Sequence, residues 1–407
     1  MALAHFGDDQ RSGVYQATGL PDQAEIAWRA ATEYPVLESP VLVDGTLVVS
    51  DTGGLVYAFD AATGAERWRH DHSKDIDAEE IRPGGIEAPI GAGHGMVFIG
   101  EVGDRLRVHD LRTGELLPSI DVTGHPTVTG DMLLLHGPGA RLLNLPDLTR
   151  RKASRKAGET WLSTPPTIAG GVAYAARGLY APLLNGGLEA LNLRTGRQTF
   201  TVPGMLECGT ECVLDLDRCA HPAFGENLLW LPVTWREPEA GFPSGGGVAG
   251  FDPRNGQLRI RHLLDHRWPA GPVAVAGGTL YFVDEADHSD HGAPPVLGRT
   301  LNAMEAATGK TRWTYGLDSH AIGTPVLAAD VVYTLTSEGM LHAVDAITGQ
   351  RRWTLGLGES IELRELFFID RLESREFVFE EEGLAVLPAD NRVYVRAGAG
   401  ITALHVT

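Results

Sequence analysis

Three cysteines and one histidine form the strongest local cluster of chemically useful side chains. Its members are Cys208, Cys212, Cys219 and His221. Thiolate sulfur and imidazole nitrogen are the ligands that Zn2+ prefers in tetrahedral sites. The cluster therefore predicts a zinc ion that holds together a loop with no core of its own. Three alternatives stay open for the thiols: free or buried side chains, a catalytic thiol, or a disulfide with one cysteine left over, for which Cys208–Cys212 is the natural pair in an oxidising compartment.

A second cluster alternates carboxylates with imidazoles on a loop after a predicted strand. Its members are Asp284, Glu285, Asp287, His288, Asp290 and His291. Such a set can bind Zn2+, Mn2+, Fe2+ or Ni2+. Asp265–His266 and Asp318–His320 lie on neighbouring repeats, where an aspartate can orient an imidazole. These residues together predict a composite divalent-metal site, and a solvated acidic loop is the alternative.

Histidines and aspartates of several loops predict a catalytic set at the mouth of a central channel. The set is His125, His221, His266, His288, His291 and His320, with Asp287 or Asp318 as the orienting carboxylate. Imidazoles at such a site can transfer protons, and a bound metal can activate water or polarise a carbonyl. The alternative is that these are ordinary polar loop residues.

Two further charged stretches have plainer interpretations. His70 and His72 can face one way on an extended chain, but the acidic residues that follow favour a solvated loop over a binding site. The basic run over residues 148–156 is typical of an outer strand edge that discourages aggregation, or it is a contact for an acidic partner.

Composition excludes several classes of function. The 407 residues carry a formal net charge of −19, which disfavours binding to nucleic acid. No apolar run reaches the length of a membrane span. The first residues contain no signal-peptide pattern, so the sequence as written predicts a cytoplasmic protein, or an exported one if its natural chain begins earlier.

One phrase recurs along the chain and defines the architecture. It reads Leu55–Trp68, returns at Leu301–Trp313 and Leu341–Trp353, and ends each time in Asp/Glu-x-x-Thr-Gly before a tryptophan. Short apolar runs between Gly and Asp turns are typical of strands. Four strands per unit, repeated radially, predict an all-β, eight-bladed β-propeller of four-stranded antiparallel blades.

The predicted ring uses the whole of residues 1–407 as a single domain. The blades are expected near residues 38–70, 86–122, 125–158, 164–203, 221–264, 271–317, 323–357 and 384–406. Because the last unit lacks a fourth strand, residues 24–30, which carry Trp28, are expected to close it.

The phrase A-x-D-A-x-T-G-x-x-x-W resembles the repeat of the pyrroloquinoline-quinone-like (quinoprotein-type) eight-bladed propeller family. The resemblance implies that Trp28, Trp68, Trp313 and Trp353 pack between neighbouring blades, and that blades 2 to 5, which lack this tryptophan, make different contacts. The family includes quinone-dependent alcohol dehydrogenases, a lipoprotein of outer-membrane barrel assembly and kinase sensor domains. Its quinone enzymes typically use adjacent cysteines, which this sequence lacks, so no bound quinone is expected.

The long connections fall on one face of the predicted ring. They are residues 69–87, 204–221, 234–247, 265–271, 285–297 and 356–383. Long loops in a compact ring carry recognition or catalysis. We therefore expect a scaffold that binds a protein or small-molecule ligand on this long-loop face, with or without a metal. The alternative is a metal-assisted or acid–base enzyme with its site at the channel mouth.

Overall fold

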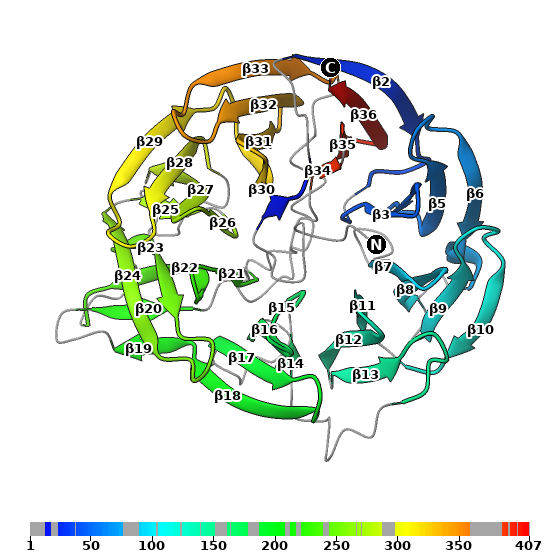
Figure 1. Ribbon diagram of the computed structural model, residues 1–407, viewed down its shortest axis with the longest axis horizontal. Coiled ribbons are helices and arrows are strands. Elements are labelled where there is room, and N and C mark those ends of the chain that lie inside the picture. Colours follow the sequence, from blue (N-terminus) through cyan, green and yellow to red (C-terminus); the bar gives the residue numbers. More distant parts are fainter. Residues whose placement is uncertain are drawn as a thin grey trace, which may run out of the picture.

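The computed structural model describes most of the chain. The described residues are 13–17, 23–36, 38–75, 89–102, 105–122, 124–138, 140–150, 161–162, 164–177, 187–207, 212–216, 221–238, 244–265, 267–269, 271–286, 298–358, 385–389, 391–396 and 398–406. They form eight sheets that follow one another around a ring (Figure 1). The chain is therefore an all-β, eight-bladed propeller, as the repeat predicts.

Blades 1 to 4 are antiparallel sheets that succeed one another along the chain. Blade 1 contains β3 (Val41–Val43), β4 (Thr46–Ser50), β5 (Leu55–Asp60) and β6 (Glu66–Asp71), and the 3-10 turn η1 (His72–Asp75) follows it. Blade 2 contains β7 (Ile90–Gly93), β8 (Met96–Val102), β9 (Arg105–Asp110) and β10 (Leu116–Ile120). Blade 3 contains β11 (His125–Thr129), β12 (Met132–Pro138), β13 (Arg141–Asn144) and β14 (Trp161–Leu162). Blade 4 contains β15 (Thr167–Ala169), β16 (Val172–Arg177), β17 (Gly187–Asn192) and β18 (Arg197–Pro203).

Blades 5 to 8 repeat this plan, and the sheets of blades 5, 6 and 7 contain additional short strands. Blade 5 contains β19 (Met205–Glu207), β20 (Val213–Asp215), β21 (Ala223–Gly225), β22 (Leu228–Arg236), β23 (Gly245–Phe251) and β24 (Leu258–Asp265). Blade 6 contains β25 (Arg267–Pro269), β26 (Ala274–Ala276), β27 (Thr279–Ala286), β28 (Thr300–Glu305) and β29 (Thr311–Gly316). Blade 7 contains β30 (Ala321–Ala328), β31 (Val331–Thr336), β32 (Met340–Asp345) and β33 (Arg351–Gly356). Blade 8 contains β34 (Val386–Ala389), β35 (Arg392–Arg396) and β36 (Gly400–Val406).

The N-terminal segment closes the ring, which confirms the expectation for residues 24–30. Strand β2 (Ala24–Ala31) pairs antiparallel with β36 and becomes the outer strand of blade 8, with Trp28 opposite Ala403. The sequence did not predict a second contact, in which β1 (Val14–Tyr15) pairs parallel with β30 of blade 7. Figure 1 shows β1 on the inner side of the ring.

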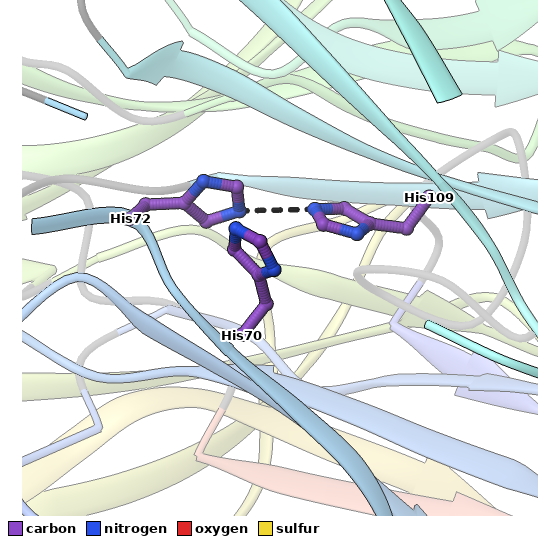
Figure 2. A group of neighbouring side chains, drawn as sticks. All are labelled: His70, His72 and His109. Atoms are coloured by element: carbon purple, nitrogen blue, oxygen red, sulfur yellow. Dashed lines mark hydrogen bonds between the residues drawn. The ribbon is translucent and has the colours of Figure 1, made fainter. Parts of the chain in front are cut away.

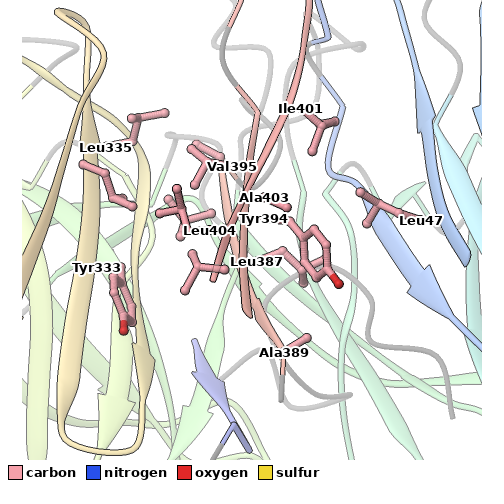
Figure 3. Close-up of a cluster of buried hydrophobic side chains, with 14 of the residues drawn as sticks. Leu47, Tyr333, Leu335, Leu387, Ala389, Tyr394, Val395, Ile401, Ala403 and Leu404 are labelled. Carbon is pink, nitrogen blue, oxygen red and sulfur yellow. The ribbon is translucent and has the colours of Figure 1, made fainter. Parts of the chain in front are cut away.

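A large apolar core lies at the point of closure. Leu47 of blade 1, Tyr333 of blade 7 and Leu404 of blade 8 belong to one buried cluster (Figure 3). Because apolar burial is the main favourable term in folding, this cluster stabilises the joint that the N-terminal strand completes.

The repeated turn has the hydrogen bonds that its sequence predicts. In Asp60-Ala-Ala-Thr-Gly, the Asp60 carboxylate accepts bonds from the backbone N–H of Ala62 and Thr63 and from the Thr63 hydroxyl, at 2.8–3.1 Å. Asp110 and Asp345 accept the same three bonds in their own turns. These bonds and the Arg67 guanidinium, which is the largest cause, lower the pKa of Asp60 to about 2.

Tryptophan joins blades as the family resemblance implies. The Nε1–H of Trp68 donates to the carbonyl of Leu111 in the next blade at 2.9 Å, and Trp313 donates to Ala346 at 3.0 Å. A Cβ at Gly114 or Gly349, the glycine of the receiving turn, would lie 2.6 Å from the ring. The glycine is therefore needed for the close approach as well as for its positive φ.

Two blades without the tryptophan use other rings at the same place. In blade 5, His262 bonds the carbonyl of Ala306 through Nε2 at 2.8 Å and lies against Gly309. In blade 4, Phe200 lies against Gly256. Blades 4 and 5 thus differ as predicted, because Phe200 and His262 take the place that tryptophan has in blades 1 and 6.

Candidate functional site

The two faces of the ring differ in their connections. Turns between the first and second strands and between the third and fourth strands are short, and they define the short-turn face. Several turns between the first and second strands consist of two residues with positive φ, such as Asp44–Gly45. This conformation is typical of tight hairpins. The opposite face is the long-loop face, and parts of its connections lie outside the described residues.

The cysteine cluster is only partly described. Cys212 is buried between blades 4 and 5, in a cluster with Tyr174 and Leu229, and it forms a disulfide bond. Cys208 and Cys219 lie outside the described residues. A disulfide sulfur offers no thiolate to a metal, so the zinc site at Cys208, Cys212, Cys219 and His221 stays a prediction for the reduced chain. His221 is 1% exposed.

The predicted channel-mouth set is not gathered into one site within the described residues. His125 lies on β11, where its ring contacts His136 with centroids 5.1 Å apart. His320 directly precedes β30, on blade 7. No group of three possible metal ligands in the described part of the chain contains His125, His221 or His320. His266, Asp287, His288 and His291 lie outside the described residues, so the catalytic set stays a prediction.

Asp318 does orient an imidazole, but it is that of His342. The Nε2–H of His342 donates to the Asp318 carboxylate at 3.0 Å, and the Tyr315 hydroxyl lies 3.1 Å from Nδ1. Because a carboxylate only accepts, a neutral His342 carries its proton on Nε2 and receives the tyrosine O–H on Nδ1. Burial raises the pKa of Tyr315, which keeps its hydroxyl protonated for this role.

Asp284, the first member of the acidic cluster, is a structural residue rather than a solvated one. It is 1% exposed, and the Arg267 guanidinium lies 2.5 Å from its carboxylate. Arg267 also donates to the Asn302 side chain at 3.4 Å. This ion pair links β25 to β27 within blade 6.

Three histidines meet between blades 1 and 2. His70 lies one residue before the end of the outer strand β6, His72 begins η1, and His109 lies near the end of β9 (Figure 2). Their possible ligand nitrogens all lie within 4.8 Å of one another, and His72 and His109 are 0% exposed. The solvated loop favoured from sequence for His70 and His72 is therefore wrong, because β6 continues to Asp71 and the turn η1 that follows begins with the buried His72, so both rings lie in the contact between blades.

Sequence reasoning missed His109 and His342, although a signal existed for His109. Both occupy the third strand of a repeat, and the positions corresponding to His109 in blades 1 and 7 hold Phe59 and Val344. A histidine at a position that other repeats fill with a buried apolar residue marks a polar site. Aligning the repeats column by column would have found it.

Comparison with known proteins places the chain in a family. The sequence matches the PQQ-type repeat family described as outer membrane protein assembly factor BamB, over residues 11–132, 52–200 and 240–367. The chain belongs to this PQQ-like β-propeller family. The matched segments make up more than half of the chain and confirm the resemblance carried by the repeated phrase.

A curated relative in this family is a dehydrogenase. The quinohemoprotein alcohol dehydrogenase ADH-IIG of Pseudomonas putida is 27% identical over 131 residues. The match covers 29% of this chain and 18% of the relative, so this chain spans less than a fifth of that protein.

Solved structures share the ring at low sequence identity. The quinohemoprotein alcohol dehydrogenase of Comamonas testosteroni matches with a TM-score of 0.66 and 14% identity, over 100% of this chain and 80% of its own. BamB of Moraxella catarrhalis matches with a TM-score of 0.59 and 13% identity, over 94% of this chain and 100% of its own. Identity this low shows the fold alone.

Among helices of the described residues, none has the length and apolar character needed to cross a bilayer.

Proposed function

We propose that this chain is a binding propeller that presents its long-loop face to a protein partner. The observation that carries the proposal is the unequal construction of the two faces. Short turns of the repeated Asp-x-x-Thr-Gly type are closed by their own hydrogen bonds, as at Asp60 and Asp345, and leave few groups for recognition. The long-loop face has the connections that vary between blades, and such loops carry binding in rigid scaffolds.

The structural likeness extends over the whole of one scaffold-type neighbour. All of the Moraxella catarrhalis BamB chain is matched, whereas a fifth of the Comamonas testosteroni dehydrogenase chain lies beyond the match. BamB is described as an outer membrane protein assembly factor, and by analogy a protein partner is the class proposed here.

A quinone cofactor, which the names of the dehydrogenase relatives imply, does not fit the residues of this chain. The adjacent cysteine pair expected of a quinone enzyme is missing, since four positions separate the nearest two cysteines, Cys208 and Cys212. Cys212 is itself buried in the apolar core between blades 4 and 5. No quinone-dependent step is therefore proposed.

We propose an oxidising compartment as the place of function. Disulfides persist in such compartments and are rare in the cytosol, and Cys212 forms one. This favours the exported alternative over the cytoplasmic one. Cell fractionation with a thiol-alkylation assay tests it, because a cytosolic chain with three reactive thiols would contradict the proposal.

Site-specific crosslinking tests the choice of face. On the long-loop face, a photo-crosslinking residue replaces Tyr34 or Met205, whose side chains are 49% and 51% exposed. On the short-turn face, it replaces Ile347, which is 78% exposed, or Ala62. One defined protein crosslinked in the native host from the first pair only is the expected result. Equal crosslinking from both faces, or crosslinking from Ile347 and Ala62 alone, would overturn the proposal.

A further inference from the structure

The outer strand of blade 1 carries a row of rings toward blade 2. Residues two apart on a strand share a face, so Trp68 and His70 point to the same side of β6. His72 begins the turn η1 that follows, and its ring packs against that of His70. Trp68 donates to the carbonyl of Leu111, which shows that this side meets blade 2. His109 of β9 completes the group from the facing blade (Figure 2).

The rings of the three histidines are in mutual contact. The centroid of His70 lies 4.5 Å from that of His72 and 4.8 Å from that of His109, and His72 lies 5.1 Å from His109. The Nε2 atoms of His72 and His109 are 3.0 Å apart. In a tetrahedral zinc site with Zn–N bonds of about 2.0–2.1 Å, neighbouring nitrogens are about 3.3 Å apart. The two buried nitrogens thus already lie near ligand spacing, and His70, which is half-buried, brings a third ring whose ligand nitrogen belongs to a set within 4.8 Å.

A backbone contact fixes the proton of His109. Its Nδ1 lies 3.0 Å from the carbonyl oxygen of Gly114. Because a carbonyl only accepts, Nδ1 carries the proton and Nε2 of the neutral ring presents its lone pair toward His72 and His70. An imidazole whose far nitrogen donates to a carbonyl is the usual arrangement of a metal ligand.

Packing holds this ring in place without a ligand. Trp68 stacks on His109 with centroids 5.7 Å apart and an interplanar angle of 20°. The backbone N–H of His72 donates to the carbonyl of Gly54 at 2.9 Å. Two of the three candidate ligands are therefore preorganised, which lowers the entropic cost of binding.

We propose that His70, His72 and His109 bind a divalent transition-metal ion, Zn2+, between blades 1 and 2. Three neutral imidazoles without a carboxylate suit zinc, copper or nickel rather than magnesium or calcium. Three protein ligands leave the fourth position of a tetrahedral ion to water. Binding moves the proton of His72 from Nε2 to Nδ1, so the three ligand rings keep their total number of protons.

The alternative is a pair of histidines that share one hydrogen bond and bind no metal. The chain itself supplies variants that separate the two ideas. Register and backbone hydrogen bonds place Tyr315 and Leu317 of blade 6 at the positions of His70 and His72, and Val344 of blade 7 at the position of His109. His70→Tyr, His72→Leu and His109→Val are therefore substitutions that this fold already accommodates elsewhere.

The test is a calorimetric titration of the full chain, freed of metal with its disulfide intact, with Zn2+ alone. One equivalent is expected to bind, and each of the three variants is expected to lose about tenfold or more in affinity, the scale on which even outer-shell partners act. The melting temperature should rise with Zn2+ concentration in the native chain, and in the variants only at about tenfold higher concentration or above.

Controls keep each outcome decisive. Cys212→Ser should leave this binding unchanged, and Co2+ in place of Zn2+ should give the visible spectrum of a four-coordinate ion. If His109→Val fails to fold, His109→Gln, which keeps a hydrogen-bonding group, is used in its place. Unchanged zinc affinity in the histidine variants, or its loss in Cys212→Ser, would overturn the proposal.

Discussion

The contact between blades 1 and 2 can be set beside that between blades 6 and 7, because the same tryptophan begins both. Trp68 and Trp313 each stand opposite an alanine of their own blade, Ala58 and Ala303. Each donates to a carbonyl in the turn of the next blade and packs on that turn's glycine. Up to this point the two contacts are copies of each other.

The contacts differ at the next two positions whose side chains face the neighbouring blade. After Trp313, Tyr315 and Leu317 pack into an apolar cluster that also contains Val344. After Trp68, the corresponding positions hold His70 and His72, which meet His109 of blade 2. The repeat geometry therefore fixes which positions of neighbouring blades are in contact. The residue types at those positions decide whether the contact is apolar packing or a polar cluster.

The polar residues also differ in their relation to solvent. The hydrogen bonds from Tyr315 through His342 end on Asp318, whose side chain is 43% exposed. The bond between His72 and His109 joins two residues that are 0% exposed. A buried polar pair is costly when one member is removed, so the 1–2 contact is the more sensitive of the two to a single substitution in its polar group.

The largest expected loss of stability follows removal of the tryptophan that both contacts share. Trp313→Ala and, in metal-free protein, Trp68→Ala should each destabilise the ring by about 3 kcal/mol or more, because a buried aromatic ring and its hydrogen bond are lost. Equilibrium unfolding in urea measures both. A loss below about 1 kcal/mol in either variant would show that the tryptophan does not join the blades.

A smaller loss of unfolding free energy is expected when glycine is replaced by alanine. Three such variants separate the close packing of a tryptophan ring on the glycine from the strain of its positive φ. Gly349→Ala and Gly114→Ala place a Cβ 2.6 Å from a tryptophan ring at φ of 71° and 72°, whereas Gly45→Ala has φ of 69° and nothing within 4 Å. All three incur strain of about 1–2 kcal/mol, and the first two should lose about 1 kcal/mol more from displaced packing. Equal unfolding free energies for the three variants would contradict the packing role.

A double-mutant cycle measures the buried histidine pair without metal. His109→Val alone leaves His72 with a lost partner and should destabilise by about 1–3 kcal/mol. His72→Leu with His109→Val rebuilds the apolar filling of the 6–7 contact and should recover about 1 kcal/mol or more of that loss. Additive effects of the two changes would show that the pair has no coupling.

The smallest effect concerns acid. The Arg352 guanidinium lowers the pKa of Asp345 to about 2, while Asp110 is lowered chiefly by the Thr113 hydroxyl and backbone bonds. A depressed folded-state pKa adds stability above the unfolded value of 3.8, and that stability is lost as pH falls from about 4 to about 2. Asp345→Asn should flatten the acid side of the stability profile more than Asp110→Asn. The reverse order, from unfolding curves across this range, would contradict the assignment.

Much of the fold is readable from local sequence. The Asp-x-x-Thr-Gly phrase encodes a turn through bonds within a few residues, as at Asp60 and Thr63, and Trp28 marks the strand that closes the ring. Period-two apolar runs give the strands. These features depend on residues that are near in sequence, so they can be predicted without a structure.

The sites depend on contacts between repeats and were harder to predict. His72 and His109 are 37 positions apart and meet only because two strands of different blades are brought into register. His262 stands in for a tryptophan for the same reason. The cysteine set rests on nearness in sequence, and the catalytic set rests on the face where its loops were expected to lie. Neither criterion identifies side chains of two facing blades that meet in the contact between them.

The most direct measurement is the zinc-edge X-ray absorption spectrum of the full chain, disulfide intact, loaded with one equivalent of Zn2+. Binding between blades 1 and 2 predicts nitrogen and oxygen neighbours at about 2.0–2.1 Å, imidazole scattering beyond them, and no sulfur. That imidazole signal should decrease in His109→Val. Sulfur neighbours at about 2.3 Å would place the ion on the cysteine cluster and contradict the account.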